Sequence, residues 1–267
     1  MAPPNIPQTS SIACPAPLPT WDADPMALNL KGKTVLVTGG ARGIGRAIAE
    51  RLSDSGANVA ICSLREASLQ QALDQLRARA AAGSGAEIAG IQADVSDRDS
   101  VARLFRWLDT EFGGLDVLVN NAGVGIFKDL GSLQADEWRA VLGTNLDGVY
   151  YCIHEALPRL RRRGGGWIVN ISSLAGKNPF AGGAAYNASK FGLCGLAEAV
   201  MLDHRYEEVK VTTILPGSVS TEFGRGGGAE WKIAPEDVAD AVAMVLSMPA
   251  RTLISHVEIR PSKPPRK

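Results

Sequence analysis

The sequence predicts an α/β fold in which a single domain holds a doubly wound, parallel seven-stranded sheet with helices on both faces. Two observations support this prediction. Short apolar runs alternate along the chain with longer segments of helical periodicity, which is the pattern of parallel strands joined by crossover helices. A glycine-rich turn also joins the first apolar run to the first helix, an arrangement that can hold phosphate groups at a helix N-terminus.

In the first half of the chain, each predicted strand is a short apolar run and each predicted helix has apolar residues at helical spacing. Strands are expected at residues 33–38, 58–63, 88–93 and 115–119, and helices at residues 46–55, 66–82 and 98–112. Leu69 and Leu73 mark the buried side of the second helix, which Gly83-Ser84-Gly85 ends. Ser96 or Asp97 can cap the third helix.

The second half of the chain continues the same alternation. Helices are expected at residues 137–163, 184–206 and 235–248, and strands at residues 167–171, 210–215 and 256–259. In the longest helix, Leu142, Leu146 and Val149 lie on one side. Pro235 occupies the first position of the last helix, where a backbone N–H would have no partner within the helix, so proline costs no hydrogen bond there.

The two ends of the chain differ in composition from this alternating part. Residues 1–28 are rich in proline and lack the basic start and apolar core of a secretory signal, which predicts a flexible tail. Residues 29–260, which contain the alternating strands and helices, are expected to form one folded domain. Residues 261–267 are basic and proline-rich, and they predict a short solvated tail.

Composition excludes several classes of function. The 267 residues carry a formal net charge of zero, which argues against a nucleic-acid or anionic-membrane partner. No apolar run approaches the roughly 18 residues of a membrane span. The four cysteines and three histidines have no metal-ligand spacing, so no metal site is expected. Cysteines inside predicted elements behave as small core residues, which predicts a reducing, cytoplasmic compartment.

The glycine-rich turn is the first candidate functional motif. Gly39, Gly43 and Gly45 stand between the first strand and the first helix, with Arg42 and Ile44 among them. Glycines let the backbone approach a pyrophosphate, and the helix N-terminus supplies N–H groups and positive potential. The position of this turn predicts a Rossmann-like dinucleotide site.

The end of the second strand indicates which dinucleotide is preferred. Proteins that use NAD commonly place an acid there to hold the ribose 2′-hydroxyl, and this chain has Ser63, Leu64 and Arg65 instead. No carboxylate would repel a 2′-phosphate, and Arg42 and Arg65 could bind it. The sequence therefore favours NADP over NAD.

A second motif follows the strand at residues 167–171. Ser173 lies at the end of that strand, where open α/β sheets place their ligands. Tyr186 and Lys190 are four residues apart on a predicted helix, so they share one face. A neighbouring ammonium and the helix N-terminus should both lower the pKa of the Tyr186 phenol, which predicts a general acid and base.

With these motifs identified, the chain resembles the short-chain dehydrogenases/reductases from about Leu30 to Pro261. Five features in order carry the resemblance: Thr38-Gly39-x-x-x-Gly43-Ile44-Gly45, Asn120-Asn121-Ala122-Gly123, Asn145, Ser173 with Tyr186-x-x-x-Lys190, and Pro216-Gly217 followed by Thr221. The interval between Ser173 and Tyr186 also matches the family. Leu64 is a departure, because similar NADP-using proteins often carry arginine there.

The resemblance implies a role for each catalytic residue. Tyr186 gives a proton to a substrate carbonyl oxygen, or takes it back in the oxidative direction. Ser173 hydrogen-bonds that oxygen, and Lys190 lowers the pKa of Tyr186 and binds the nicotinamide ribose. Asn145 holds a water molecule that links Lys190 to solvent.

The resemblance also implies the remaining cofactor contacts. Asp94 and Val95 border the adenine, whereas Asn121, Ala122 and Gly123 line the cofactor cleft. The segment that contains Pro216, Gly217, Val219 and Thr221 holds the nicotinamide. Similar proteins form dimers or tetramers through the helices that carry Asn145 and Tyr186, which predicts a homo-oligomer.

The predicted function is NADP-dependent reduction of a ketone or 3-oxoacyl group to a secondary alcohol, with a small carbonyl or alcohol compound as substrate. Two alternatives remain, namely an NAD-linked secondary-alcohol dehydrogenase and a non-catalytic protein that senses a dinucleotide. Phe127, Phe180, Phe223 and Trp231 are expected to line an open, apolar substrate pocket.

Overall fold

The computed structural model describes residues 28–223 and 229–265. The predicted N-terminal tail, apart from Leu28, lies outside the described residues, as do residues 224–228 and the last two residues of the predicted basic tail.

Seven parallel strands form one sheet in the order β3-β2-β1-β4-β5-β6-β7. The strands are β1 (Thr34–Thr38), β2 (Asn58–Ser63), β3 (Ile88–Gln92), β4 (Val117–Asn120), β5 (Gly166–Ile171), β6 (Val209–Pro216) and β7 (His256–Ile259). The order runs outward in both directions from β1 and β4, which is the doubly wound arrangement that the sequence predicts. The fold-class prediction is confirmed.

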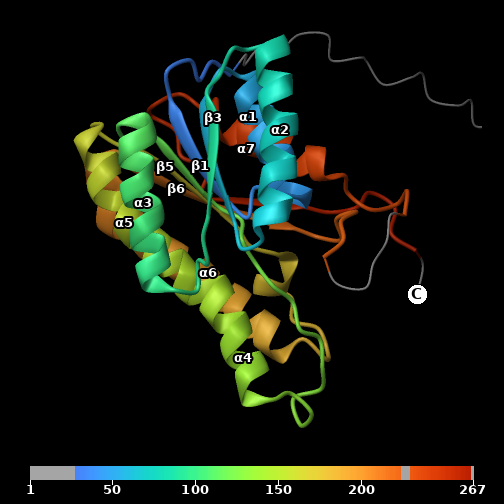
Figure 1. The fold of residues 1–267 in the computed structure, drawn as a ribbon. Helices are drawn as coiled ribbons and strands as arrows, with labels where there is room; N and C mark the ends of the chain where they lie inside the picture. The colour runs from blue at the N-terminus through green and yellow to red at the C-terminus, as the bar shows by residue number, and fades with distance from the viewer. Residues whose placement is uncertain (1–27, 224–228, 266–267) are drawn as a thin grey trace, which may run out of the picture.

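Helices cover both faces of this sheet (Figure 1). The helices are α1 (Gly43–Asp54), α2 (Glu66–Ala82), α3 (Arg98–Phe112), α4 (Ala135–Leu142), α5 (Gly148–Arg162), α6 (Ala184–His204) and α7 (Pro235–Leu246). Short turns of other helix types are η1 (Gly143–Asp147), η2 (Leu174–Gly176) and η3 (Arg205–Glu207). In Figure 1, α1, α2 and α7 lie on one side of the sheet and α3 and α5 on the other.

Each face of the sheet has its own hydrophobic core because successive side chains of a strand point to opposite faces. Along β1, Val35 and Val37 pack with residues of α1, α2 and α7, whereas Leu36 packs with residues of α3, α5 and α6. All three side chains are fully buried. Burial on both faces explains why the strands are continuous apolar runs rather than alternating ones.

The predicted single helix at residues 137–163 is interrupted in the structure. It consists of α4, the π-helical turn η1 and α5, with Asn145 inside the π-helical turn. The fully buried Asn145 side chain makes hydrogen bonds to the backbone of Val124, outside its own helix. Helical periodicity cannot predict such contacts with a distant segment. Insertions of this kind often mark functional sites.

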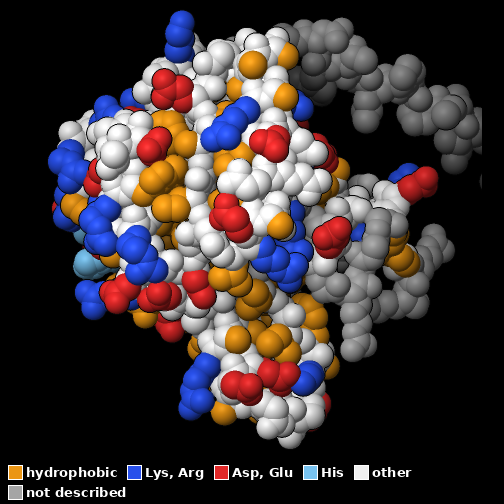
Figure 2. All heavy atoms as spheres, viewed as in Figure 1, with side chains coloured by type: hydrophobic (Ala, Val, Ile, Leu, Met, Phe, Trp, Pro, Cys, Tyr) orange, Lys and Arg blue, Asp and Glu red, His pale blue; other side chains and the backbone are white. Residues whose placement is uncertain are grey.

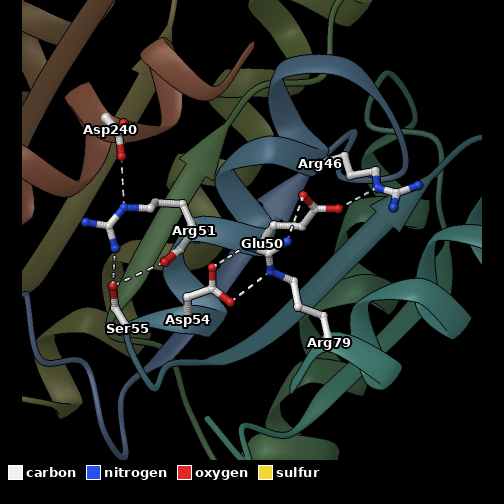
Figure 3. Close-up of polar contacts among 7 residues, drawn as sticks. All are labelled: Arg46, Glu50, Arg51, Asp54, Ser55, Arg79 and Asp240. Atoms are coloured by element: carbon white, nitrogen blue, oxygen red, sulfur yellow. Dashed lines mark hydrogen bonds and ion pairs between the residues drawn. The ribbon is translucent and has the colours of Figure 1, made fainter. Parts of the chain in front are cut away.

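Polar contacts join the helices of one layer at the surface (Figure 3). Arg51 of α1 donates to Asp240 of α7 at 2.9 Å. Arg79 of α2 donates two hydrogen bonds to Asp54 of α1, at 2.9 and 2.7 Å. Because these groups are solvated, we expect each pair to contribute less than about 1 kcal/mol to stability.

Charged side chains of both signs intermix over the face shown in Figure 2, consistent with the zero net charge. Hydrophobic side chains gather low in the view, over the part of the fold where α4 and α6 lie. None of the helices in the described part of the chain combines the length and apolar character needed to cross a membrane.

Candidate active site

The predicted site residues gather at the carboxyl ends of β1, β4 and β5. The strand order reverses between β1 and β4, and open α/β sheets bind ligands in the crevice that such a reversal creates. Ser173 follows β5 at the same edge, and α6 begins across from it with Tyr186 in its first turn.

A network of hydrogen bonds fastens the glycine-rich turn to the end of β4. The Asn121 side-chain amide donates to the carbonyl oxygens of Thr38 and Gly39, at 3.0 and 3.2 Å. In return, the Thr38 hydroxyl accepts from the backbone N–H groups of Asn121 and Ala122, at 3.0 and 3.1 Å. Gly39 has a φ of +64°, and a Cβ there would lie 2.9 Å from the Ala122 Cα, so this close approach requires glycine.

The start of α1 fits the pyrophosphate of a dinucleotide. Its N-cap residue, Arg42, makes no side-chain capping bond, and its first turn contains no acidic residue. The first N–H groups of α1 are therefore free of a side-chain acceptor, and the helix dipole favours an anion at this end. Gly43 has a φ of +54° and lies against Thr221, so the turn also reaches the loop that follows β6.

The end of β2 carries no acidic side chain at the positions that the sequence identified. Ser63 ends the strand, Leu64 is exposed, and Arg65 begins α2 as its N-cap residue. The other predicted arginine, Arg42, instead pairs with Glu222 at 3.6 Å. Within residues 28–223 and 229–265, Arg65 has no ion-pair partner, and it is thus the better placed of the two arginines to meet a 2′-phosphate.

Asp94 and Val95 follow β3, at the predicted adenine end of the crevice. The Asp94 carboxylate accepts from the Ser96 backbone N–H and hydroxyl, at 2.9 and 2.7 Å. Val95 is buried, and a Cβ at Gly148 would lie 2.8 Å from its carbonyl oxygen. This loop therefore packs directly on the start of α5.

Tyr186 and Ser173 form the centre of the candidate active site. Tyr186 is only 9% exposed, and its phenol is hydrogen-bonded to the Ser173 hydroxyl. Burial raises the pKa of Tyr186 above its ordinary value, and the hydrogen bond with Ser173 partly offsets that shift. The prediction of a lowered pKa is therefore wrong for this structure, because desolvation outweighs the other effects. The phenol stays protonated at neutral pH, as a proton donor must.

Lys190 lies beneath Tyr186 but does not contact its hydroxyl group. The ammonium donates to the Ile171 carbonyl at 3.0 Å and lies 5.7 Å from the centre of the Tyr186 ring. Lys190 is fully enclosed, and burial lowers its pKa to about 8. The carbonyl at the end of β5 thus fixes the ammonium on the Tyr186 side of the crevice.

Asn145 is held by three hydrogen bonds to other segments. Its Oδ1 atom accepts from the Val124 N–H at 2.8 Å, and its Nδ2 atom donates to the Val124 carbonyl at 2.9 Å and to the Ser189 hydroxyl at 3.1 Å. Ser189 immediately precedes Lys190 on α6. Asn145 therefore ties the loop after β4 to the helix that carries the candidate catalytic residues.

The loop after β6 meets the glycine-rich turn where Thr221 lies against Gly43. β6 ends at Pro216, and the Gly217 N–H donates to the Ile259 carbonyl at 2.8 Å. Val219 forms a bridge with Ile233, and the Thr221 N–H donates to the Val219 carbonyl at 3.0 Å.

Several residues of the site were not singled out from the sequence. Ser189, Asn187 and Glu222 each position a predicted residue or its neighbour, and none belongs to the motifs discussed above. The sequence offered one indication of their importance, because they are the immediate neighbours of Lys190, Tyr186 and Thr221. Within the described ranges, no three His, Cys, Asp or Glu side chains are arranged to hold a metal ion.

The four aromatic residues predicted to line the pocket do not all lie together. Phe127, Phe180 and Phe223 surround the Tyr186 ring. Trp231 instead lines a separate hollow of about 580 Å³ with neighbouring residues and the segment after β7.

Comparison with known proteins gives the same picture. The family model described as short chain dehydrogenase matches residues 33–229. The 3-oxoacyl-[acyl-carrier-protein] reductase FabG of Staphylococcus aureus (strain Mu50 / ATCC 700699) is 36% identical over 192 residues, which are 72% of this chain and 76% of that protein. The glycine betaine reductase ATRR of Emericella nidulans is 32% identical over 249 residues, which are 88% of this chain but only 19% of that much longer protein.

A solved structure extends the comparison to three dimensions. A metagenomic short-chain oxidoreductase in complex with NADP superimposes with a TM-score of 0.77 at 36% identity, covering 88% of this chain and 99% of that chain. The match therefore includes both the sheet and the helices that carry the candidate site. The chain belongs to the short-chain dehydrogenase family, and it is an NAD(P)-dependent oxidoreductase.

Proposed function

We propose that this protein is an NADP-dependent carbonyl reductase that converts a ketone or 3-oxoacyl group into a secondary alcohol. The observation that carries the proposal is the buried Tyr186 phenol beside Ser173 at the carboxyl edge of the sheet, with the Lys190 ammonium 5.7 Å from the centre of the Tyr186 ring. A buried, protonated phenol can donate a proton to a carbonyl oxygen as negative charge develops there.

The proposed roles follow from where each group is held. A nicotinamide dinucleotide bound in the crevice supplies the hydride for the carbonyl carbon. Ser173 orients the carbonyl oxygen by a hydrogen bond, and Tyr186 transfers its phenol proton to that oxygen. Lys190, with its pKa lowered to about 8, can exchange a proton near neutral pH. Asn145 donates a hydrogen bond to Ser189, the residue before Lys190, and so holds this part of α6 in position.

The first test is NADPH oxidation with a panel of simple ketones, diketones, β-keto esters and β-keto thioesters. We expect Tyr186→Phe to reduce turnover by about a hundredfold or more while leaving NADPH binding intact. The matched control is Tyr206→Phe, because the Tyr206 side chain is 92% exposed and lies in η3, which follows the C-terminal end of α6. Turnover within a few-fold of the unmodified protein in Tyr186→Phe would contradict the proton-donor role.

The same panel separates the two alternative functions. Clear NADPH binding without turnover of any carbonyl would favour a non-catalytic dinucleotide sensor. Faster oxidation of secondary alcohols with NAD than reduction of ketones with NADPH would favour the NAD-linked dehydrogenase.

We propose NADP as the preferred cofactor because Ser63, Leu64 and Arg65 present no carboxylate at the end of β2. Arg65→Glu should weaken NADPH binding about tenfold or more and leave NADH binding nearly unchanged, since only NADPH carries the 2′-phosphate. Arg106→Glu on α3 makes the same charge change at another exposed arginine and serves as the control. Equal losses for both cofactors would contradict this assignment.

We also propose that the protein forms a homo-oligomer through α5 and α6. Tyr150 of α5 and Phe191 of α6 are both exposed in the single chain, and large exposed apolar side chains commonly mark interfaces. Phe191→Glu should lower the molar mass measured by light scattering to that of one chain. Tyr206→Glu, in the exposed turn η3 that follows α6, should leave the molar mass unchanged.

A cytoplasmic location is part of this proposal. Cys62, Cys152 and Cys194 are free cysteines, and the first two are buried. Free thiols of this kind are typical of reducing compartments.

A further inference from the structure

Three phenylalanines from distant segments converge on the ring of Tyr186. Phe127 follows β4, Phe180 precedes α6 and Phe223 follows β6. Their ring centres lie 5.5, 6.4 and 5.9 Å from that of Tyr186. Phe127 also lies 5.7 Å from Phe180 and 6.5 Å from Phe223, so it is the central member of this aromatic wall.

The aromatic wall is open to a ligand on its outer side. Phe127, Phe180 and Phe223 are 40, 45 and 42% exposed, whereas Tyr186 behind them is 9% exposed. Three large apolar side chains rarely share a solvent-exposed cluster in a soluble protein without a binding role. A ligand ring placed against this wall would cover them and lie beside the buried phenol.

The positions of the rings are fixed by their surroundings. A Cβ at Gly125 would lie 2.7 Å from the Phe127 ring, and one at Gly183 would lie 2.6 Å from the Phe180 ring. Both rings therefore pack against the backbone at glycines, and a Cβ at either position would displace them. The Asn187 amide donates to the Phe180 carbonyl at 2.8 Å, which ties that segment to α6 directly beside Tyr186.

The charged residues next to these phenylalanines are engaged elsewhere. Lys128 forms an ion pair with Glu137 at the start of α4. Glu222 pairs with Arg42 across the glycine-rich turn at 3.6 Å. Among the residues that the structure describes, the aromatic wall therefore presents ring faces and edges rather than charge, and it suits a neutral ligand with an aromatic ring.

We infer that the substrate is an aryl ketone, a neutral carbonyl compound with an aromatic ring bonded directly to the carbonyl carbon. This inference rests on the proposed function. Edge-to-face and offset contacts with Phe127, Phe180 and Phe223 hold the substrate ring, since aromatic pairs favour these geometries. The adjacent carbonyl oxygen then lies at the Tyr186 phenol.

The reaction balances as a two-electron reduction. The carbonyl carbon accepts the hydride that the reduced nicotinamide supplies, and the carbonyl oxygen takes the Tyr186 phenol proton as the C=O π bond breaks. The products are a secondary benzylic alcohol and the oxidised cofactor, and solvent restores the proton to Tyr186.

The experiment compares acetophenone with cyclohexyl methyl ketone, which has a similar size but no aromatic ring, using the full chain and NADPH. We expect acetophenone to be reduced with the higher kcat/KM. Phe127→Leu should lower kcat/KM about tenfold more for acetophenone than for the cyclohexyl ketone, mainly through KM. Phe112→Leu is the matched control, because Phe112 packs on Trp107 at the end of α3.

Different outcomes separate this inference from the proposed function. Aryl recognition would be overturned if the two ketones had equal kcat/KM, or if Phe127→Leu lowered kcat/KM equally for both. In either case the proposed carbonyl reductase function would still stand. No reduction of any ketone in the panel by the NADPH-bound protein would overturn the proposed function and the inference together. If Phe127→Leu does not fold, as judged by circular dichroism, Phe180→Leu takes its place with the same expected result.

Discussion

The buried ammonium of Lys190 makes a sharp prediction about stability. Lys190 is fully enclosed, and burial lowers its pKa from 10.5 to about 8. Below pH 8 the folded protein must hold a desolvated charge, which costs about 3 kcal/mol relative to a pH above 10.5. Lys190→Met removes that cost and keeps the length of the side chain. It also removes the hydrogen bond to the Ile171 carbonyl, a loss of about 1 kcal/mol.

The pH dependence follows from the direction of the pKa shift. A lysine with a lowered pKa binds fewer protons when folded than when unfolded, so its contribution to stability rises with pH between about 8 and 10.5. At pH 7 we expect Lys190→Met to be more stable than the unmodified protein by about 2 kcal/mol. By pH 9.5 this advantage should fall by about 2 kcal/mol and nearly vanish.

Urea unfolding of both proteins without cofactor, at one protein concentration and at several pH values, measures the difference directly. Lys31→Met removes an exposed lysine and is the matched control. If Lys190→Met were less stable at pH 7, or differed by a constant amount from pH 7 to pH 9.5, burial of the charge would not be the cause. Loss of carbonyl reduction in the same variant would show that the buried charge is retained for activity at the expense of stability.

Three further substitutions test the packing around the site and the surface ion pairs. Gly45→Ala should destabilise the protein by about 2 kcal/mol, because its Cβ would overlap the Asn121 side-chain amide. Gly195→Ala on α6, where a Cβ meets nothing within 4 Å, should instead stabilise it by about 0.5–1 kcal/mol. Asp240→Asn, which removes the exposed partner of Arg51, should change stability by less than about 0.5 kcal/mol. Thermal and urea unfolding measure all three, and a loss in Gly195→Ala as large as in Gly45→Ala would contradict the packing argument.

Helical periodicity predicted every principal helix, but it could not place the π-helical turn around Asn145. That turn exists because a buried amide must meet Val124 and Ser189, which belong to other segments. The predicted pocket was only partly right for a related reason. Phe127, Phe180 and Phe223 come together across segments that follow different strands, whereas Trp231 lies in another hollow.

The sequence by itself determined the alternation of strands and helices, the glycine-rich turn before α1, and the placement of Tyr186 and Lys190 on one helical face. These features depend on backbone geometry and on residues a few positions apart, so local pattern is enough to predict them. Only the tertiary structure decided the direction of the Tyr186 pKa shift, the partner of Lys190 and the pairing of Arg42 with Glu222. Desolvation and contacts between distant segments depend on what packs around a group, and that is fixed only when the whole chain has folded.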